Sequence, residues 1–340
     1  MGTVKQRLEE IDTLRGIAMS SMILIHTNAY FLGDKLSYFL WDYSQFAVPV
    51  FIFCSAYLGF KNRGHFKTFK SFFTHLLNRF RRLLIPYYLF AFIYFLLIAI
   101  KEPHRITSGF IMKSLLIIGG IDINWMILLF LMFTFFIPVI SYTAIRQRWL
   151  FYLLIFFSCI FSFIFIFVKF PYNYRFIMWL PWSVVIFFAR FFVKVKHSKK
   201  WIIFLFMLST SIFIISGIEL KQLSHSLVMY DNKYPPNIYN LTYGISSILA
   251  LYVLIRKGLF SFAPLKNILH FLSAHSYTIY FLHILIIYTT TILFKFKFNW
   301  FSFFLTVFIS SLAVQWVLSF TFALCCKGVR QFEYWQARAN

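Results

Sequence analysis

The sequence predicts an all-α protein, a polytopic transmembrane bundle of about ten spans with both termini in the cytoplasm. Of the 340 residues, 61% are apolar and only 13% are charged, too few to cover a water-soluble domain of this size. Stretches of about 20 residues without a charge recur along the chain, and a helix of this length crosses the core of a bilayer. Lys and Arg gather in alternate loops, which is typical of chains that cross the membrane repeatedly.

Each span is placed on a stretch that lacks charge or nearly lacks it. The second is short, between Gln45 and Lys61, and the sixth contains Pro181 and Arg190, so each is consistent with a tilted or partly re-entrant helix. The expected spans are 14–32, 46–60, 83–100, 124–141, 149–168, 176–193, 201–218, 238–255, 277–294 and 300–324.

The charges orient the chain, because positively charged short loops stay in the cytoplasm. The first inner loop, 61–82, holds seven Lys or Arg and no acid. Six of the ten acidic residues fall on the other side: Asp34, Asp42, Glu102, Asp122, Glu219 and Asp231. None of the acidic residues is expected deep inside a span, which argues against an ion-coupled transporter.

Composition also limits partners and cofactors. The net charge of +23 is spread over cytoplasmic loops, as insertion beside an anionic leaflet requires, so we expect a lipid bilayer and no nucleic acid as partner. Cys54, Cys159, Cys325 and Cys326 lie in or beside apolar stretches without metal-ligand spacing, so we expect no disulfide and no metal site. No linker divides the chain, and residues 1–340 are expected to form a single membrane domain with no soluble appendage.

Ionisable side chains within a span are candidates for function, because burying them in lipid is costly. Arg15 and His26 lie eleven residues apart in the first span. Eleven steps return a helix to within about 20° of its starting direction and climb about 16 Å, so both residues face one way. We expect Arg15 at the cytoplasmic rim and His26 near mid-membrane. Taken singly, Arg15 could instead reach lipid headgroups and His26 could bond a neighbouring helix.

Two further arginines share one helix face in the first inner loop. Arg79 and Arg82 stand at i and i+3, where two guanidinium groups can hold one phosphate. The alternative is that they serve only as charges that keep the loop in the cytoplasm, which requires no pairing.

Five separated segments carry a resemblance to a known family. The first is an Arg, ten residues and a His in the first span, present as Arg15 and His26. The others are residues 48–57, 79–82, 124–131 and 276–283. Together these segments, within residues 7 to about 290, resemble the integral-membrane acyltransferase family 3, proteins of about ten spans that mostly move acyl groups onto sugars. Ala56 stands where the family usually has Gly.

The resemblance implies an acyltransferase for groups other than amino-acyl groups, in the plasma (cytoplasmic) membrane. Its expected donor substrate is a cytoplasmic acyl-CoA, acetyl-CoA above all, and its expected acceptor is a hydroxyl of a glycan or glycolipid, as in O-acetylation of a surface polysaccharide. His26 and Arg15 would be catalytic, and Arg79 and Arg82 would bind the CoA donor, with no bound cofactor. His26 could act as a general base or carry the acyl group covalently.

A second polar group lies in the ninth span. Tyr277, Tyr280 and His283 follow one another at three-residue steps, so they could bind substrate or form hydrogen bonds between helices. Two other functions fit the same composition: a transporter or flippase of a lipid-linked sugar, and a structural membrane subunit. The second of these would not need Arg15 and His26 in register. The sequence leaves the oligomeric state open.

Overall fold

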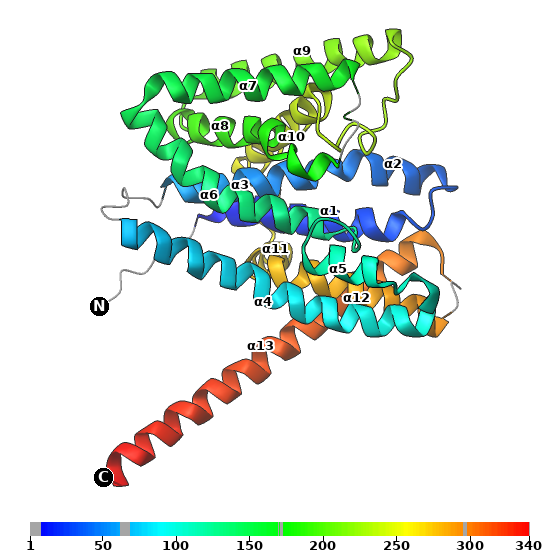
Figure 1. Ribbon diagram of the computed structural model, residues 1–340, viewed down its shortest axis with the longest axis vertical. Coiled ribbons are helices and arrows are strands. Elements are labelled where there is room, and N and C mark those ends of the chain that lie inside the picture. The colour runs from blue at the N-terminus through cyan, green and yellow to red at the C-terminus, as the bar shows by residue number, and fades with distance from the viewer. Residues whose placement is uncertain (1–7, 62–68, 169, 171–172, 295–297, 340) are drawn as a thin grey trace.

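The computed structural model describes residues 8–61, 69–168, 170, 173–294 and 298–339. Over this part of the chain the protein is a bundle of helices with no named strand, which confirms the all-α, polytopic class (Figure 1). The elements are α1 (Glu9–Asn28), α2 (Lys35–Tyr43), η1 (Ser44–Phe46), α3 (Ala47–Lys61), α4 (Phe69–Lys101), η2 (Pro103–Arg105), α5 (Ser108–Leu115), α6 (Asn124–Arg146), α7 (Arg148–Phe167), η3 (Tyr174–Phe176), α8 (Trp179–Val195), α9 (Lys199–Gln222), α10 (Ile238–Arg256), α11 (Ala263–Ala274), α12 (Ser276–Phe294) and α13 (Trp300–Ala339).

Nine helical segments among the described residues are long and apolar enough to cross a membrane. Helix α1 is not one of them by composition, because it carries Glu9, Glu10, Asp12 and Arg15. It nevertheless runs alongside the others, and the start of α1 and the end of α13 lie toward the same end of the bundle (Figure 1). With these nine, α1 brings the helical segments that run through the bundle to ten among the described residues.

The first crossing lies nearer the N-terminus than the expected 14–32. Helix α1 begins at Glu9 and ends at Asn28, where a polar turn stops it. The Asn28 amide donates to the Ser37 carbonyl at 3.2 Å, and Asp34 accepts from the Ser37 backbone N–H at 2.8 Å to cap α2. Arg15 is the seventh residue of this helix and His26 lies two residues before its end. Their depths in the membrane stay predictions.

The second crossing is longer than the expected 46–60. Helix α2, η1 and α3 join into one 27-residue segment, Lys35–Lys61, that is long enough to cross completely. Asp42 lies in the first third of this segment, in α2, and is buried. Its carboxylate is satisfied because it accepts a hydrogen bond from the Met229 backbone N–H at 2.7 Å.

The sixth crossing, expected at 176–193, is α8 preceded by η3. Pro181 occupies the first turn of α8, where a missing backbone N–H costs no intrahelical bond. Arg190 places its guanidinium over the rings of Phe60 and Phe151, 5.5 Å and 5.7 Å from their centres. The proline and the arginine are thus both compatible with a continuous helix.

Helix α1 lies at the centre of the bundle and contacts α3, α10, α11, α12 and α13. Its closest crossing is with α11, at Gly16, where an added Cβ would lie 2.2 Å from the Leu269 carbonyl oxygen. Only glycine permits this approach. The crossing presses α11, a helix the sequence did not predict, against the half of α1 that carries Arg15.

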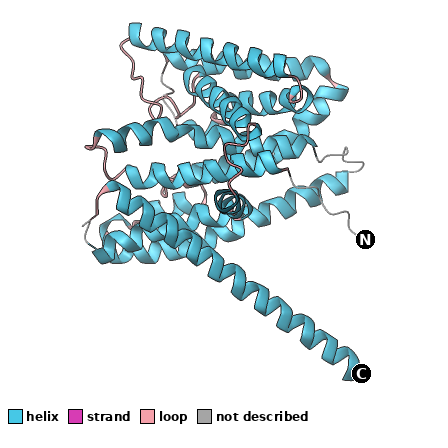
Figure 2. Cartoon of the chain, turned by 180° about the vertical axis from the view of Figure 1, so that it is seen from behind, coloured by secondary structure: helices cyan, strands magenta, loops and turns pink. Residues whose placement is uncertain are grey.

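Helices α7 and α9 form an outer layer on one side of the bundle (Figure 1). Few of their residues are buried, which fits faces covered by lipid. The buried residues of α9 include Ser209, whose hydroxyl bonds that of Ser246 in α10 at 2.8 Å. Small polar residues at such an interface let membrane helices approach closely. On the opposite side, the C-terminal part of α13 leaves the bundle and runs alone to the marked C-terminus (Figure 2).

The orientation of this bundle can be tested by thiol labelling. Residues 223–237 lie at the end of the bundle opposite the start of α1 and the end of α13 (Figure 1). Ser226→Cys should react with a membrane-impermeant maleimide in intact cells, because Ser226 is exposed there. Lys200→Cys, exposed at the other end, should react only after the membrane is opened. Lys67, an alternative position for the second label, lies outside the described residues. Labelling of Lys200→Cys in intact cells would reverse the orientation.

Candidate active site

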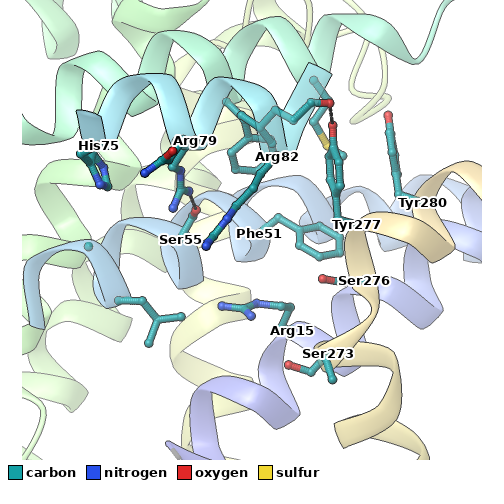
Figure 3. A pocket seen from close by; sticks show the side chains of 17 residues that line it. Arg15, Phe51, Ser55, His75, Arg79, Arg82, Ser273, Ser276, Tyr277 and Tyr280 are labelled. Atoms are coloured by element: carbon teal, nitrogen blue, oxygen red, sulfur yellow. Dashed lines mark hydrogen bonds between the residues drawn. The ribbon is translucent and has the colours of Figure 1, made fainter. Parts of the chain in front are cut away.

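A cavity of about 860 Å³ opens between α1, α3, α4, α6 and the junction of α11 with α12 (Figure 3). This volume lies in the range of sites for cofactors and small ligands. The polar part of its lining consists of Arg15, Ser55, His75, Asn78, Arg79, Arg82, Ser273, Ser276, Tyr277 and Tyr280. The cavity thus gathers five of the seven residues that the sequence identifies as candidates.

Three arginines point into the cavity from two helices (Figure 3). Arg15 comes from α1, and Arg79 and Arg82 come from α4. Arg79 donates a hydrogen bond to the Ser55 hydroxyl at 3.2 Å, and its nearest charges are the like charges of Arg15 and Arg82. Among the described residues no carboxylate lies within 4 Å of any of the three. Such a cluster of uncompensated cations favours a bound anion.

Arg79 and Arg82 share a face of α4 and both line the cavity. Helix α4 begins at Phe69 and continues for 33 residues, so the segment expected as the inner loop is mostly helix. At about 1.5 Å per residue this helix is about 50 Å long, more than a bilayer core requires. Its first turns therefore extend past the apolar layer and hold both arginines rigidly.

Two tyrosines of α12 line the cavity and form hydrogen bonds from α12 to neighbouring segments of the chain. The Tyr277 hydroxyl donates to the Leu83 carbonyl at 2.5 Å, close to Pro86, which cannot donate a backbone N–H and so loosens this part of α4. The Tyr280 hydroxyl donates to the Ile123 carbonyl at 2.8 Å, just before α6 begins. Both hydroxyl groups thus form bonds between helices, while the rings face the cavity. Binding of substrate by these tyrosines stays a prediction.

Beyond the cavity, the two histidines of the spans meet. His26 of α1 and His283 of α12 are 257 residues apart in the chain, yet Nδ1 of His26 lies 2.7 Å from Nε2 of His283. The two ring planes differ by 18°. Neither histidine lines the cavity, but the His283 ring is 5.9 Å from that of Tyr280, which does. The pair therefore lies just past the inner end of the cavity.

The hydrogen-bond partners determine which nitrogen carries each proton when both rings are neutral. Nδ1 of His283 lies 2.8 Å from the Ile279 carbonyl oxygen, which can only accept, so this nitrogen is the donor. Nε2 of His283 then carries no proton and accepts from Nδ1 of His26. In His26 the remaining nitrogen, Nε2, keeps a free lone pair and has no partner among the described residues. His26 is partly exposed, whereas His283 is fully buried.

Arg15 and His26 thus face the same side of α1, toward α11 and α12, as their spacing predicted. Met19 and Met22 lie between them in the helix and are buried. Eleven residues of helix separate the two side chains by about 16 Å along the axis. The polar side of α1 therefore links a basic cavity with a neutral histidine pair.

The sequence did not single out Ser55 and Asn78 of the cavity lining, because one hydroxyl and one amide beside charged residues give no distinctive pattern. It also missed Lys233. Its charge fits an exposed loop with mixed charges, yet the side chain is 4% exposed and bonds the Gln45 side chain at 2.9 Å. Neither residue of that contact lies in a recognisable motif.

A comparison with protein-family models adds the family. The model described as an acyltransferase domain matches residues 8–320. The chain belongs to this acyltransferase family 3. The match covers nearly all of the bundle and extends past the segments that carried the resemblance. Comparisons with curated proteins and with solved structures found no significant match. The acyltransferase is thus a multi-pass membrane protein whose candidate arginines and histidines lie on the central helix α1 and on α4 and α12.

Proposed function

We propose that this acyltransferase moves an acyl group, expected to be acetyl, from a cytoplasmic CoA thioester to a hydroxyl of a glycan or glycolipid. The observation that supports this most is the combination of three uncompensated arginines in an open cavity with a neutral histidine pair just beyond it. The arginines suit a polyanionic donor, and the histidines suit proton transfer at the reacting hydroxyl.

The donor would bind with its phosphates at Arg15, Arg79 and Arg82. Guanidinium groups form forked hydrogen bonds with phosphate, and here they share one cavity with no carboxylate competing for them among the described residues. The part of the cavity at Tyr280, whose ring lies beside that of His283, would direct the thioester toward the histidine pair.

His26 would act as the general base through Nε2. The acceptor oxygen attacks the thioester carbonyl carbon, so a carbon–oxygen bond forms while the carbon–sulfur bond breaks. The hydroxyl proton passes to Nε2 of His26, and the CoA thiolate that leaves takes up a proton in turn. His283 would position the ring, because its bond to Nδ1 holds His26 in the tautomer with Nε2 unprotonated.

The product would be an O-acylated glycan of the cell surface, made by a protein of the plasma membrane. Incubation of membranes with radiolabelled acetyl-CoA tests the reaction. We expect label to pass to a glycan or glycolipid and to be released by mild base, as from an ester. Movement of a lipid-linked sugar across the bilayer without acyl transfer would instead identify a flippase.

Replacement of either cavity arginine of α4 should weaken donor binding. A hydrogen bond to a charged group contributes about 1.5–3 kcal/mol, so Arg79→Ala or Arg82→Ala should raise the Kd for acetyl-CoA by about 10- to 100-fold. Lysine should restore binding only partly, because an ammonium cannot form the forked contact. Arg81→Ala is the matched control, since Arg81 lies between the two and does not line the cavity. An unchanged Kd in both Arg79 and Arg82 variants would exclude this donor site.

Replacement of His26 by alanine should abolish transfer and leave membrane insertion unchanged. Loss of a general base costs at least about 100-fold in turnover, and the Kd for acetyl-CoA should hardly change because His26 lies outside the cavity. His225→Ala is the control, a histidine that bonds the Ile166 carbonyl far from the pair. The base role is wrong if more than half of the turnover survives, or if an acyl group is found covalently attached to His26.

Replacement of His283 tests its role in positioning His26. Glutamine can still accept a hydrogen bond from Nδ1 of His26, whereas leucine cannot. We expect His283→Leu to lower turnover by about 100-fold or more and His283→Gln by less than about 10-fold, both with unchanged acetyl-CoA affinity. Solid-state ¹⁵N NMR of histidine-labelled protein should show the Nε2-unprotonated form of His26 in the wild type and its loss in His283→Leu. Equal activity of the two variants would contradict the positioning role.

A further inference from the structure

Lys233 is a buried cation that the proposed reaction has not used. It belongs to residues 223–237, which connect α9 with α10 at the end of the bundle opposite the start of α1 and the end of α13 (Figure 1). Its side chain is 4% exposed, and burial lowers the pKa of Lys233 from 10.5 to about 7. Burying an ammonium costs several kcal/mol unless an anion compensates it.

No such anion is present among the described residues. Of the acidic residues near this loop, Asp42 accepts from the Met229 backbone N–H, and Asp231 accepts from the Ser226 hydroxyl. In the part of the chain that the structure describes, no carboxylate lies within 4 Å of the Lys233 Nζ atom. An ammonium has three hydrogen-bond donors, and of these one is used, by the Gln45 side-chain oxygen at 2.9 Å.

The ammonium is held in a defined place. Its Nζ atom lies 5.3 Å from the ring centres of both Trp125 and Tyr234, within the range of cation–π attraction. The loop that carries it is itself fixed, because the Asn240 side chain donates to the Met229 carbonyl at 3.1 Å and the Asn232 side chain to the Val228 carbonyl at 2.9 Å. Lys233 is therefore preorganised, as electrostatic stabilisation of a transition state requires.

The position of Lys233 connects it with the proposed reaction. Gln45, which accepts its hydrogen bond, belongs to η1, and η1 packs against α1, the helix that carries His26. Trp125, which it contacts, directly precedes Met126 at the inner end of the cavity. The ammonium thus lies on the far side of the place where a thioester from the cavity would meet His26.

Arg175 is a second buried cation, and its contacts are those of a purely structural residue. Arg175 is 6% exposed, but its guanidinium donates to the Asn124 side-chain oxygen and to the Ile117 carbonyl, which ties η3 to the start of α6. Arg175 thus has two oxygen acceptors and bridges chain segments. Among the described residues Lys233 has one acceptor, which leaves two of its donors unused.

We propose that the Lys233 ammonium donates a hydrogen bond to the oxyanion that forms on the acyl carbonyl when the acceptor hydroxyl attacks it beside His26. This inference rests on the proposed acyl transfer. During attack the carbonyl oxygen takes up the electron pair of its π bond, and it returns the pair as the carbon–sulfur bond breaks. The positive charge of Lys233 stabilises the oxyanion, and Lys233 keeps its proton. The hydroxyl proton goes to His26.

The test compares Lys233→Met with Lys101→Met in the purified full-length protein, with radiolabelled acetyl-CoA as donor and membranes of the source cells as acceptor. Lys101 is the matched control: it also bonds one side-chain oxygen, that of Thr291 at 2.9 Å, and lies over one ring, Tyr288. Unlike Lys233, it lies 3.9 Å from a carboxylate, that of Glu102. Turnover, the KM for each substrate and the Kd for acetyl-CoA are measured.

We expect Lys233→Met to lower kcat by about 100- to 1000-fold, the cost of one lost oxyanion donor, with the Kd for acetyl-CoA changed less than about twofold. Lys233→Arg should keep more activity than Lys233→Met. In a His26→Ala background, Lys233→Met should cost little more, because both groups act on the same step. Lys101→Met should keep wild-type turnover.

Other outcomes overturn the inference. Wild-type turnover in Lys233→Met would remove Lys233 from the reaction and leave the acyl transfer itself intact. An increased acceptor KM with unchanged kcat would make Lys233 a binding group for an anionic acceptor instead. Absence of transfer by the wild type would end both proposals. If Lys233→Met does not fold, Gln45→Leu, which releases the ammonium from its one acceptor, should lower kcat by about 10-fold at unchanged donor affinity, and an unchanged kcat would overturn the role.

Discussion

The cost of placing charged and polar groups in an apolar, lipid-facing protein determines how this bundle is arranged. Helix α1 carries acidic residues, Arg15 and His26, and lipid could not solvate them. It therefore lies at the centre, with α3, α10, α11, α12 and α13 around it. Helices whose exposed faces are apolar, such as α7 and α9, lie outside. The least hydrophobic crossing thus becomes the core, and the site follows the polar face of that helix.

The polar groups near α1 differ in how their charges and hydrogen bonds are satisfied. At one end, the arginines remain uncompensated in an open cavity, where water or a ligand can solvate them. At the other, the histidines bond each other and His283 also bonds the Ile279 carbonyl, so Nε2 of His26 is the one ring nitrogen of the pair left without a partner among the described residues. This difference separates a region suited to holding charge from one suited to moving a proton. Tyr280 joins the two, since its ring faces the cavity and lies beside His283.

The sequence predicted those parts of the fold that depend on local pattern. The bounds of α6, α7 and α10 nearly match the expected spans because charged residues flank each apolar stretch. Helix α2 was missed because Asp42 resembles a loop residue until Met229, far along the chain, satisfies it. Helix α11 was missed because it does not cross the membrane, and its place depends on Gly16 in another helix.

For the site, helical periodicity was enough to predict that Arg79 and Arg82 share one helix face. It was also enough to predict that Arg15 and His26 share a face of α1. Nothing local could show that His26 meets His283, because that contact joins residues 257 positions apart. The same reason hid Lys233 and Gln45, whose contact joins an expected outer loop to an expected span. Long-range contacts between single polar residues leave no periodic pattern.

The separation of Arg15 and His26 along α1 also sets the distance that a donor must span between its phosphates and its reacting group. A rigid helix holds the two side chains about 16 Å apart, and Met19 and Met22 between them are packed in the core, so the gap cannot shrink. Under the proposed reaction, a compact acyl phosphate held by the arginines would end far short of His26. A donor with a long, slender arm between its phosphates and its thioester spans the gap. The central helix would therefore act as a ruler that selects donors by reach as well as by charge.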